Sequence, residues 1–141
     1  MKKPDWIIHL VCIESPAGFI DAHTHCMREK YNHLEFQMVL PVSPETIGKI
    51  LNLLGDRVRN GDCFHDGEMV SDILVGYDVK LRKMVEDGEE LLRVMLPDEK
   101  GRFPGDVRCE AMFSVQDKPL AELKRYSVPK SGVDYSGAIR S

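Results

Sequence analysis

Two histidines separated by a single residue, His23 and His25, stand in a stretch whose loose alternation predicts a β-strand, and Asp21 lies two positions before the first. Residues two apart on a strand point to the same side of a sheet, so these three side chains are expected to share one face. Imidazole nitrogens and carboxylate oxygens are ligands that Zn²⁺ takes, usually four in a tetrahedron. The spacing therefore predicts a face able to hold a divalent metal such as zinc.

Two further groups of candidate ligands follow along the chain. His33 and Glu35 are expected on the facing side of the next strand, and Cys63 and His65 form a Cys-x-His pair in a loop. The candidate metal ligands are accordingly His23, His25, Cys63 and His65. The competing interpretation is that these histidines cap loops, or pair with carboxylates on a solvated sheet face.

No motif in the chain identifies a reaction. The His-x-His segment is similar to the opening metal motif of the amidohydrolase superfamily, but those enzymes are (β/α)₈ barrels of about 250 residues. A chain of 141 residues is too short for that barrel. Glycine-rich phosphate loops and a Gly-x-Ser-x-Gly elbow are absent from the sequence. Whether the protein is an enzyme therefore stays open.

Composition narrows the class of protein. A length of 141 residues and 43% hydrophobic residues are typical of one globular domain. The net charge of −4, with basic and acidic residues interspersed, argues against a nucleic-acid partner. We find no apolar run of the roughly 20 residues that a membrane span needs, and no export signal. We therefore expect a cytoplasmic domain with free cysteines, whose partner is a protein, a small-molecule ligand or a second copy.

The first half of the chain predicts three strands and one long helix. Strands are expected over 5–13, well buried, over 19–27 and over 34–40, with a polar connection at 28–32, and they suggest an antiparallel meander. A helix is expected over 44–60, because a serine and a proline suit its first positions and apolar residues recur at helical spacing.

The second half predicts a hairpin. Residues 61–78 resemble a loop, and the Asp87-Gly88 turn signal separates runs 79–86 and 89–96. A helix over 79–86 also fits the spacing of its apolar residues. We predict a short helical turn within 119–125.

Together these elements predict an α/β (α+β) fold, a mostly antiparallel sheet with the 44–60 helix packed across it. A single domain is expected over 1–126, followed by a flexible tail over 127–141.

Three stretches carry a resemblance to a known family. They are His23–Met27 with Tyr31–Phe36, the helix from Ile50 to Gly61 with Phe64 and Gly67, and Leu96–Pro104 with its Pro-Asp-x-x-Gly-Arg-Phe-Pro run. The chain resembles the bacterial domain of unknown function 4262 family of small proteins. Cys26 stands where that pattern usually has glycine, and Leu34 where it often has proline. The resemblance implies an α/β architecture and no particular reaction.

The resemblance also suggests where a ligand binds. If the three stretches meet, they form a concave site, with His23, His25, His33, Glu35 and Arg102 as the candidate binding residues. Two functional hypotheses follow. The first is a non-enzymatic binding or interaction module, and the alternative is a small metal-binding protein or metal-dependent hydrolase that uses the His, Glu and Asp groups.

Overall fold

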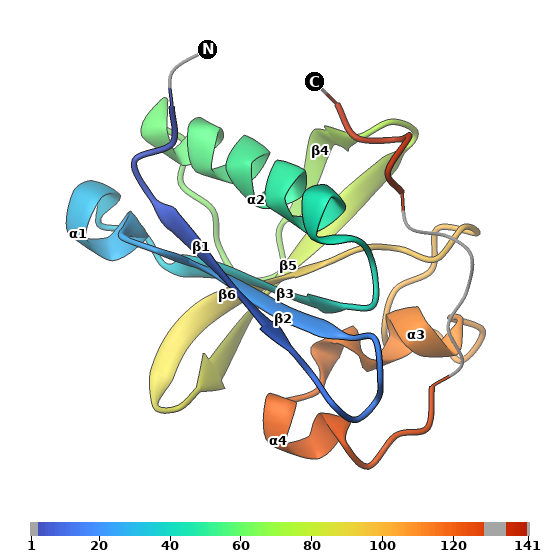
Figure 1. Ribbon diagram of the computed structural model, residues 1–141. Coiled ribbons are helices and arrows are strands. Elements are labelled where there is room, and N and C mark those ends of the chain that lie inside the picture. Colours follow the sequence, from blue (N-terminus) through green and yellow to red (C-terminus); the bar gives the residue numbers. More distant parts are fainter. Residues whose placement is uncertain (1–2, 129–134, 141) are drawn as a thin grey trace.

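A computed structural model describes residues 3–128 and 135–140, and its centre is a six-stranded sheet with strand order β1-β2-β3-β6-β5-β4 (Figure 1). The strands are β1 (Ile7–Cys12), β2 (Ile20–His25), β3 (Glu35–Leu40), β4 (Met69–Leu74), β5 (Tyr77–Glu86) and β6 (Glu89–Met95). All neighbouring strands are antiparallel except β3 and β6, which run parallel. The predicted α+β class, with a mostly antiparallel sheet, is confirmed.

Strands β5 and β6 form the hairpin that was predicted in the second half of the sequence. Its two turn residues, Asp87 and Gly88, have φ angles of 51° and 79°. Both are in the left-handed region, which an Asp-Gly pair adopts readily in a two-residue hairpin turn. The run 79–86 is therefore part of a strand rather than a helix, because seven of its residues, from Lys80 to Glu86, pair with β6.

Helix α2 (Pro44–Arg59) covers one face of the sheet and confirms the predicted helix. It begins where Ser43 Oγ accepts a hydrogen bond from the backbone N–H of Thr46 at 3.2 Å. Its apolar stripe is buried; the stripe consists of Ile47, Ile50, Leu51, Leu54 and Val58.

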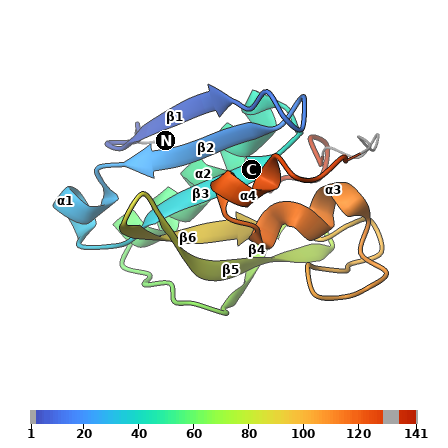
Figure 2. The ribbon, with the colours of Figure 1, turned by 90° about the horizontal axis from the view of Figure 1, so that it is seen from below.

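Three short elements lie against the opposite face, namely α3 (Ala111–Ser114), the 3₁₀ turn η1 (Val115–Asp117) and α4 (Leu120–Leu123). Figures 1 and 2 show α2 on one side of the sheet and α3 and α4 on the other. The short helix predicted within 119–125 is confirmed by α4. On this face, opposite α2, residues His9 of β1 and His25 of β2 remain exposed.

The prediction that the first strand is well buried is wrong. Five of the six residues of β1 are exposed, including Ile7, Leu10 and Val11. The apolar run was typical of a buried strand, but β1 is an edge strand whose outer side has no neighbour in the sheet.

Two further expectations are corrected. The supposed connection at 28–32 contains helix α1 (Met27–Tyr31), which follows Cys26 in a left-handed conformation with φ 85°. The supposed loop over 61–78 contains β4, whose pairing with β5 shifts register between Val70 and Leu74. Both elements are short or irregular, so neither produces a clear periodicity in the sequence.

The predicted flexible tail, 127–141, falls partly outside the described residues, which omit 129–134 and 141. The described part includes Tyr135, which is buried and whose hydroxyl donates to the carbonyl of Pro97. Ile139 forms a β-bridge with Leu74. No described helix is long and apolar enough to cross a membrane.

Candidate metal centre

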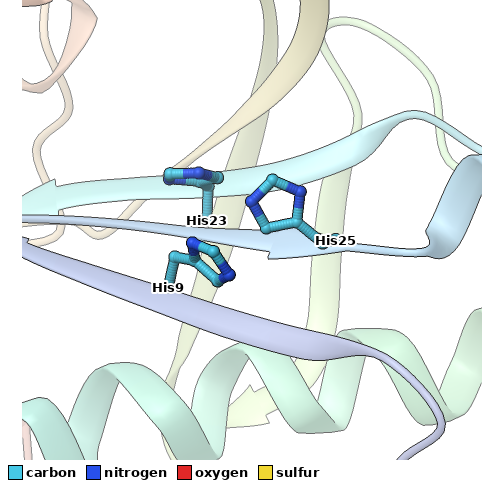
Figure 3. A group of neighbouring side chains, drawn as sticks. All are labelled: His9, His23 and His25. Carbon is cyan, nitrogen blue, oxygen red and sulfur yellow. The ribbon is translucent and has the colours of Figure 1, made fainter.

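Three histidines lie together on strands β1 and β2, on the face of the sheet that points away from α2 (Figure 3). His23 and His25 alternate along β2, and His9 lies on β1 directly opposite His23 in the antiparallel register. The ring centroids of His9 and His25 are 4.1 Å apart, and those of His23 and His25 are 4.8 Å apart. Residues 23 and 25 are on the side of β2 opposite to Ala22, which is fully buried in the core. We refer to His9, His23 and His25 as the histidine cluster.

The cluster has the geometry of an incomplete metal site. One ring nitrogen from each histidine lies within 4.8 Å of those of the other two. Tetrahedral zinc with bonds of about 2.0–2.1 Å needs ligand nitrogens about 3.3 Å apart, so small side-chain rotations would bring these nitrogens to bonding distance. His9 and His25 are exposed, so no packing from the core opposes such rotations. Among the described residues, no other three histidine, cysteine or acidic groups are as close together.

A chain of polar side chains leads from the buried sheet to the cluster. Asp21 Oδ1 lies 3.8 Å from His23 Nδ1 and accepts a hydrogen bond from Gln37 Nε2 at 2.9 Å. Gln37 Oε1 in turn accepts from Arg93 Nε at 2.7 Å. Arg93 is fully buried, and its Nη1 donates to the carbonyl of Gln116 in η1. Neighbouring strands thus align these groups across β2, β3 and β6.

Arg93 is held inside the protein by charge as well as by hydrogen bonds. Burial lowers the pKa of its guanidinium to about 10, while the carboxylates of Glu86 and Asp21 oppose that decrease. Glu86 Oε2 lies 3.6 Å from Arg93 Nη2, and burial raises the pKa of Glu86 above its ordinary range. Arg93 therefore remains a cation beneath the polar face.

A cavity of about 420 Å³ opens beside the cluster. It is lined by His23, His25, Gln37 and Leu120 and by seven acidic residues, whereas Arg28 is the only lysine or arginine in its wall. The acidic residues are Asp21, Glu29, Glu35, Glu86, Asp87, Glu89 and Glu90. A surface with this excess of carboxylates attracts cations and repels anions.

His33 lies elsewhere and has a structural role. It is 6% exposed, and its Nδ1 is 2.8 Å from the carbonyl of Leu34, a bond in which Nδ1–H must donate. Its Nε2 accepts from the backbone N–H of Phe64 at 3.0 Å. Both ring nitrogens are therefore used to join the start of β3 to the loop after α2.

Glu35 lines the cavity and also organises the chain around it. Its carboxylate accepts from the Thr24 hydroxyl at 2.8 Å and from the backbone N–H groups of Met27 and Arg28 at 3.3 and 3.2 Å. Those two N–H groups begin α1, so Glu35 caps the helix that follows β2. Glu35 is close to the cluster without belonging to it.

The remaining candidates do not join the cluster. Cys63 and His65 are exposed in the loop after α2, and neither belongs to a group of three ligand residues within the described chain. Arg102 binds Asp98 through Nε at 2.9 Å, and neither lines the cavity. Of the five candidate binding residues, His23, His25 and Glu35 line the cavity, whereas the hydrogen bonds of His33 and Arg102 hold loops, and no residue of the Leu96–Pro104 stretch reaches the cavity.

His9 is the residue that sequence reasoning missed. It lies in an apolar run that resembled a buried strand, where a single histidine drew no attention. Its alternation with Ile7 and Val11 could have placed it on one strand face, but only the pairing of His9 with His23 shows which face. That pairing depends on the length of the turn between the two strands.

Comparison with known proteins places the chain in a family. The model of the family described as domain of unknown function (DUF4262) matches residues 1–110. The chain belongs to this family. The match includes all six strands and the histidine cluster, and it ends before α3. No curated protein and no solved structure matches the chain.

Proposed function

We propose that this DUF4262 domain binds a divalent metal ion of the zinc class through His9, His23 and His25. The observation that carries the proposal is the convergence of three imidazoles from two adjacent strands, with ligand nitrogens within 4.8 Å of one another. Structural zinc sites are closed by four protein ligands, whereas three leave a position for water or another ligand. The site therefore belongs to the open type.

The surroundings of the cluster support this proposal. A cation at the cluster would lie next to a cavity with seven carboxylates and only one arginine or lysine in its wall, which favours the bound over the free ion. The strands that carry the histidines are paired over six residues, so the backbone positions of the ligands are fixed before the metal arrives.

Elemental analysis of protein purified without chelator or metal-affinity resin tests the proposal. We expect near-stoichiometric zinc, or one equivalent bound on titration, in the unmodified protein. The His9→Ala variant and the double variant His23→Ala/His25→Ala should each lose that metal. The matched control is His65→Ala, which removes an exposed histidine outside the cluster and should leave the metal content unchanged.

The proposal would be overturned by protein that binds no zinc in either experiment. It would also be overturned if His65→Ala lowered the zinc content as much as His9→Ala did. Thermal stability offers a second measurement, because a ligand at 100 times its dissociation constant stabilises a folded protein by about 2.7 kcal/mol. Zinc should therefore raise the melting temperature of the unmodified protein and of His65→Ala only.

Metal-dependent hydrolysis is the second candidate function, and the open position beside a cavity is the observation that favours it. A metal-bound water that loses a proton becomes a nucleophile near neutral pH. Such a hydroxide would form a new bond to an ester carbonyl carbon while the bond from that carbon to the alcohol oxygen breaks, and the leaving oxygen would take the proton that the water lost. The acidic lining favours neutral or cationic substrates. Zinc-loaded protein should hydrolyse p-nitrophenyl acetate faster than p-nitrophenyl phosphate, and a rate no higher than that of His9→Ala would rule this function out.

A further inference from the structure

The polar chain beneath the histidine cluster ends at one particular ring atom. Asp21 Oδ1 is 3.8 Å from Nδ1 of His23, and the same oxygen is held by Gln37. Asp21 is largely buried, with its side chain 13% exposed, whereas the His23 side chain is 28% exposed. The exposed fraction thus increases along this series of side chains from Arg93 through Gln37 and Asp21 to His23. The buried side chains therefore fix the position of Asp21 next to His23.

The two inner links of this series, from Arg93 to Gln37 and from Gln37 to Asp21, are hydrogen bonds with a defined direction. The Arg93 guanidinium has only donors, so its Nε–H donates to Gln37 Oε1. That contact identifies the oxygen of the Gln37 side-chain amide, and the amide nitrogen must then face Asp21 as a donor. Gln37 is 2% exposed, so water does not compete for either contact. The carboxylate of Asp21 is thereby fixed with an acceptor next to His23.

We propose that Asp21, positioned by Gln37 and Arg93, holds the proton of His23 on Nδ1 and so presents the Nε2 lone pair to the metal. A metal-ligating histidine commonly donates its other ring N–H to a carboxylate, which fixes the tautomer and strengthens the ligand. A small rotation of the ring would shorten the 3.8 Å separation to a hydrogen bond. The inference rests on the proposed function, because it assigns an outer partner to one of the three metal ligands. Asp21 is a positioning residue here.

Two charge-matched variants separate positioning from simple electrostatics. Asp21→Asn and Glu29→Gln each remove one negative charge from the wall of the same cavity. Glu29 is exposed on α1 and makes no contact with Arg93, Gln37 or Asp21 in the hydrogen bonds that position Asp21. Zinc affinity is measured for each by competition with a chromophoric chelator. We expect Asp21→Asn to weaken zinc binding by about ten- to hundred-fold and Glu29→Gln by less than about three-fold.

A spectroscopic measurement tests the proton directly. Long-range ¹H–¹⁵N correlation of the imidazole rings distinguishes a proton on Nδ1 from one on Nε2. In metal-free unmodified protein the neutral His23 ring should carry its proton on Nδ1. The Asp21→Asn variant should shift that ring toward the Nε2–H form, whereas Glu29→Gln should leave it unchanged. A purely structural role of Asp21 would not alter the tautomer.

The outcomes distinguish the two proposals. If the unmodified protein binds no zinc, the proposed function is wrong and this inference fails with it. If the unmodified protein binds zinc but both variants weaken binding equally, or His23 carries its proton on Nε2, only the role of Asp21 is overturned. A folded Asp21→Asn variant is verified from its backbone amide spectrum, and if it does not fold, Asp21→Ser replaces it. Serine also lacks the carboxylate acceptor, so that variant should move the His23 proton in the same direction.

Discussion

His33 and the histidine cluster are two contrasting environments for the same side chain. His33 is 6% exposed and uses both ring nitrogens for hydrogen bonds inside the fold. His9 and His25 are exposed, and of the hydrogen bonds found among the described residues none involves a ring nitrogen of the cluster. A histidine whose nitrogens are already bonded stabilises structure, whereas the three histidines of the cluster, the proposed metal ligands, bring one nitrogen each within 4.8 Å of the others. The same residue type thus occurs in two different environments, and its position in the fold decides which nitrogens remain without a hydrogen bond.

Asp98, like His33, is a buried polar residue whose hydrogen bonds stabilise the fold. It is 1% exposed, and its carboxylate accepts from the backbone N–H groups of Lys100, Arg102 and Glu110. These bonds hold together the Leu96–Pro104 stretch, one of the three that carried the family resemblance. That stretch therefore marks a folded loop, and it explains why a family signature can be recognised without indicating a reaction.

The largest effect is expected for His33→Ala. The substitution leaves the buried N–H of Phe64 without its acceptor and opens a cavity, which together typically cost about 2–4 kcal/mol. Urea denaturation should show that loss in the free energy of unfolding. The control is His65→Ala. It removes an exposed histidine in the loop after α2 and should change stability by less than about 0.5 kcal/mol. Equal small effects in both variants would remove the contrast between the two environments.

A smaller effect is expected for Asp98→Asn, and it depends on pH. Burial raises the pKa of Asp98, but the hydrogen bonds from Arg102 and Glu110 outweigh burial and hold it below the ordinary value. The unfolded chain therefore binds a proton more readily than the folded protein, so this carboxylate stabilises the fold above about pH 4. That contribution is lost as the pH falls through the lowered pKa. The variant should lose about 1–3 kcal/mol at pH 7.

Stability measured from pH 7 to pH 2 checks this prediction. The unmodified protein and the control Glu99→Gln, which changes an exposed neighbour, should both lose stability in acid. Asp98→Asn should lose less over the same range, because it has no proton to take up at that position. Parallel pH curves for all three proteins would contradict the assigned role of Asp98.

The sequence was informative wherever local chemistry determined structure. The Ser43-Pro44 start and apolar stripe of α2, and the Asp87-Gly88 turn, predicted their elements correctly because each signal acts within a few residues. The family was also recognised from short local motifs. By contrast, the exposure of β1 depends on which strands lie beside it, and no local pattern specifies that.

The candidate site could be predicted only in part, for the same reason. His23 and His25 were found because alternation along one strand places them together. His9, Gln37 and Arg93 reach the same face through the register between different strands. Cys63 and His65 looked equally suitable as ligands, because spacing in a loop says nothing about direction. Side chains on one strand were therefore predictable, and their partners on other strands were not.

The smallest effect is expected for the cluster itself when no metal is present. Alanine at His9 or at His25 removes an exposed ring that makes no hydrogen bond among the described residues, so metal-free stability should change by less than about 0.5 kcal/mol. The His23→Ala variant should behave similarly, because Asp21 keeps its hydrogen bond from Gln37. Urea denaturation in the presence of a chelator measures all three. A loss of 2 kcal/mol or more for any of them would show that the ring supports the fold, and would place it with His33 instead of with a ligand site.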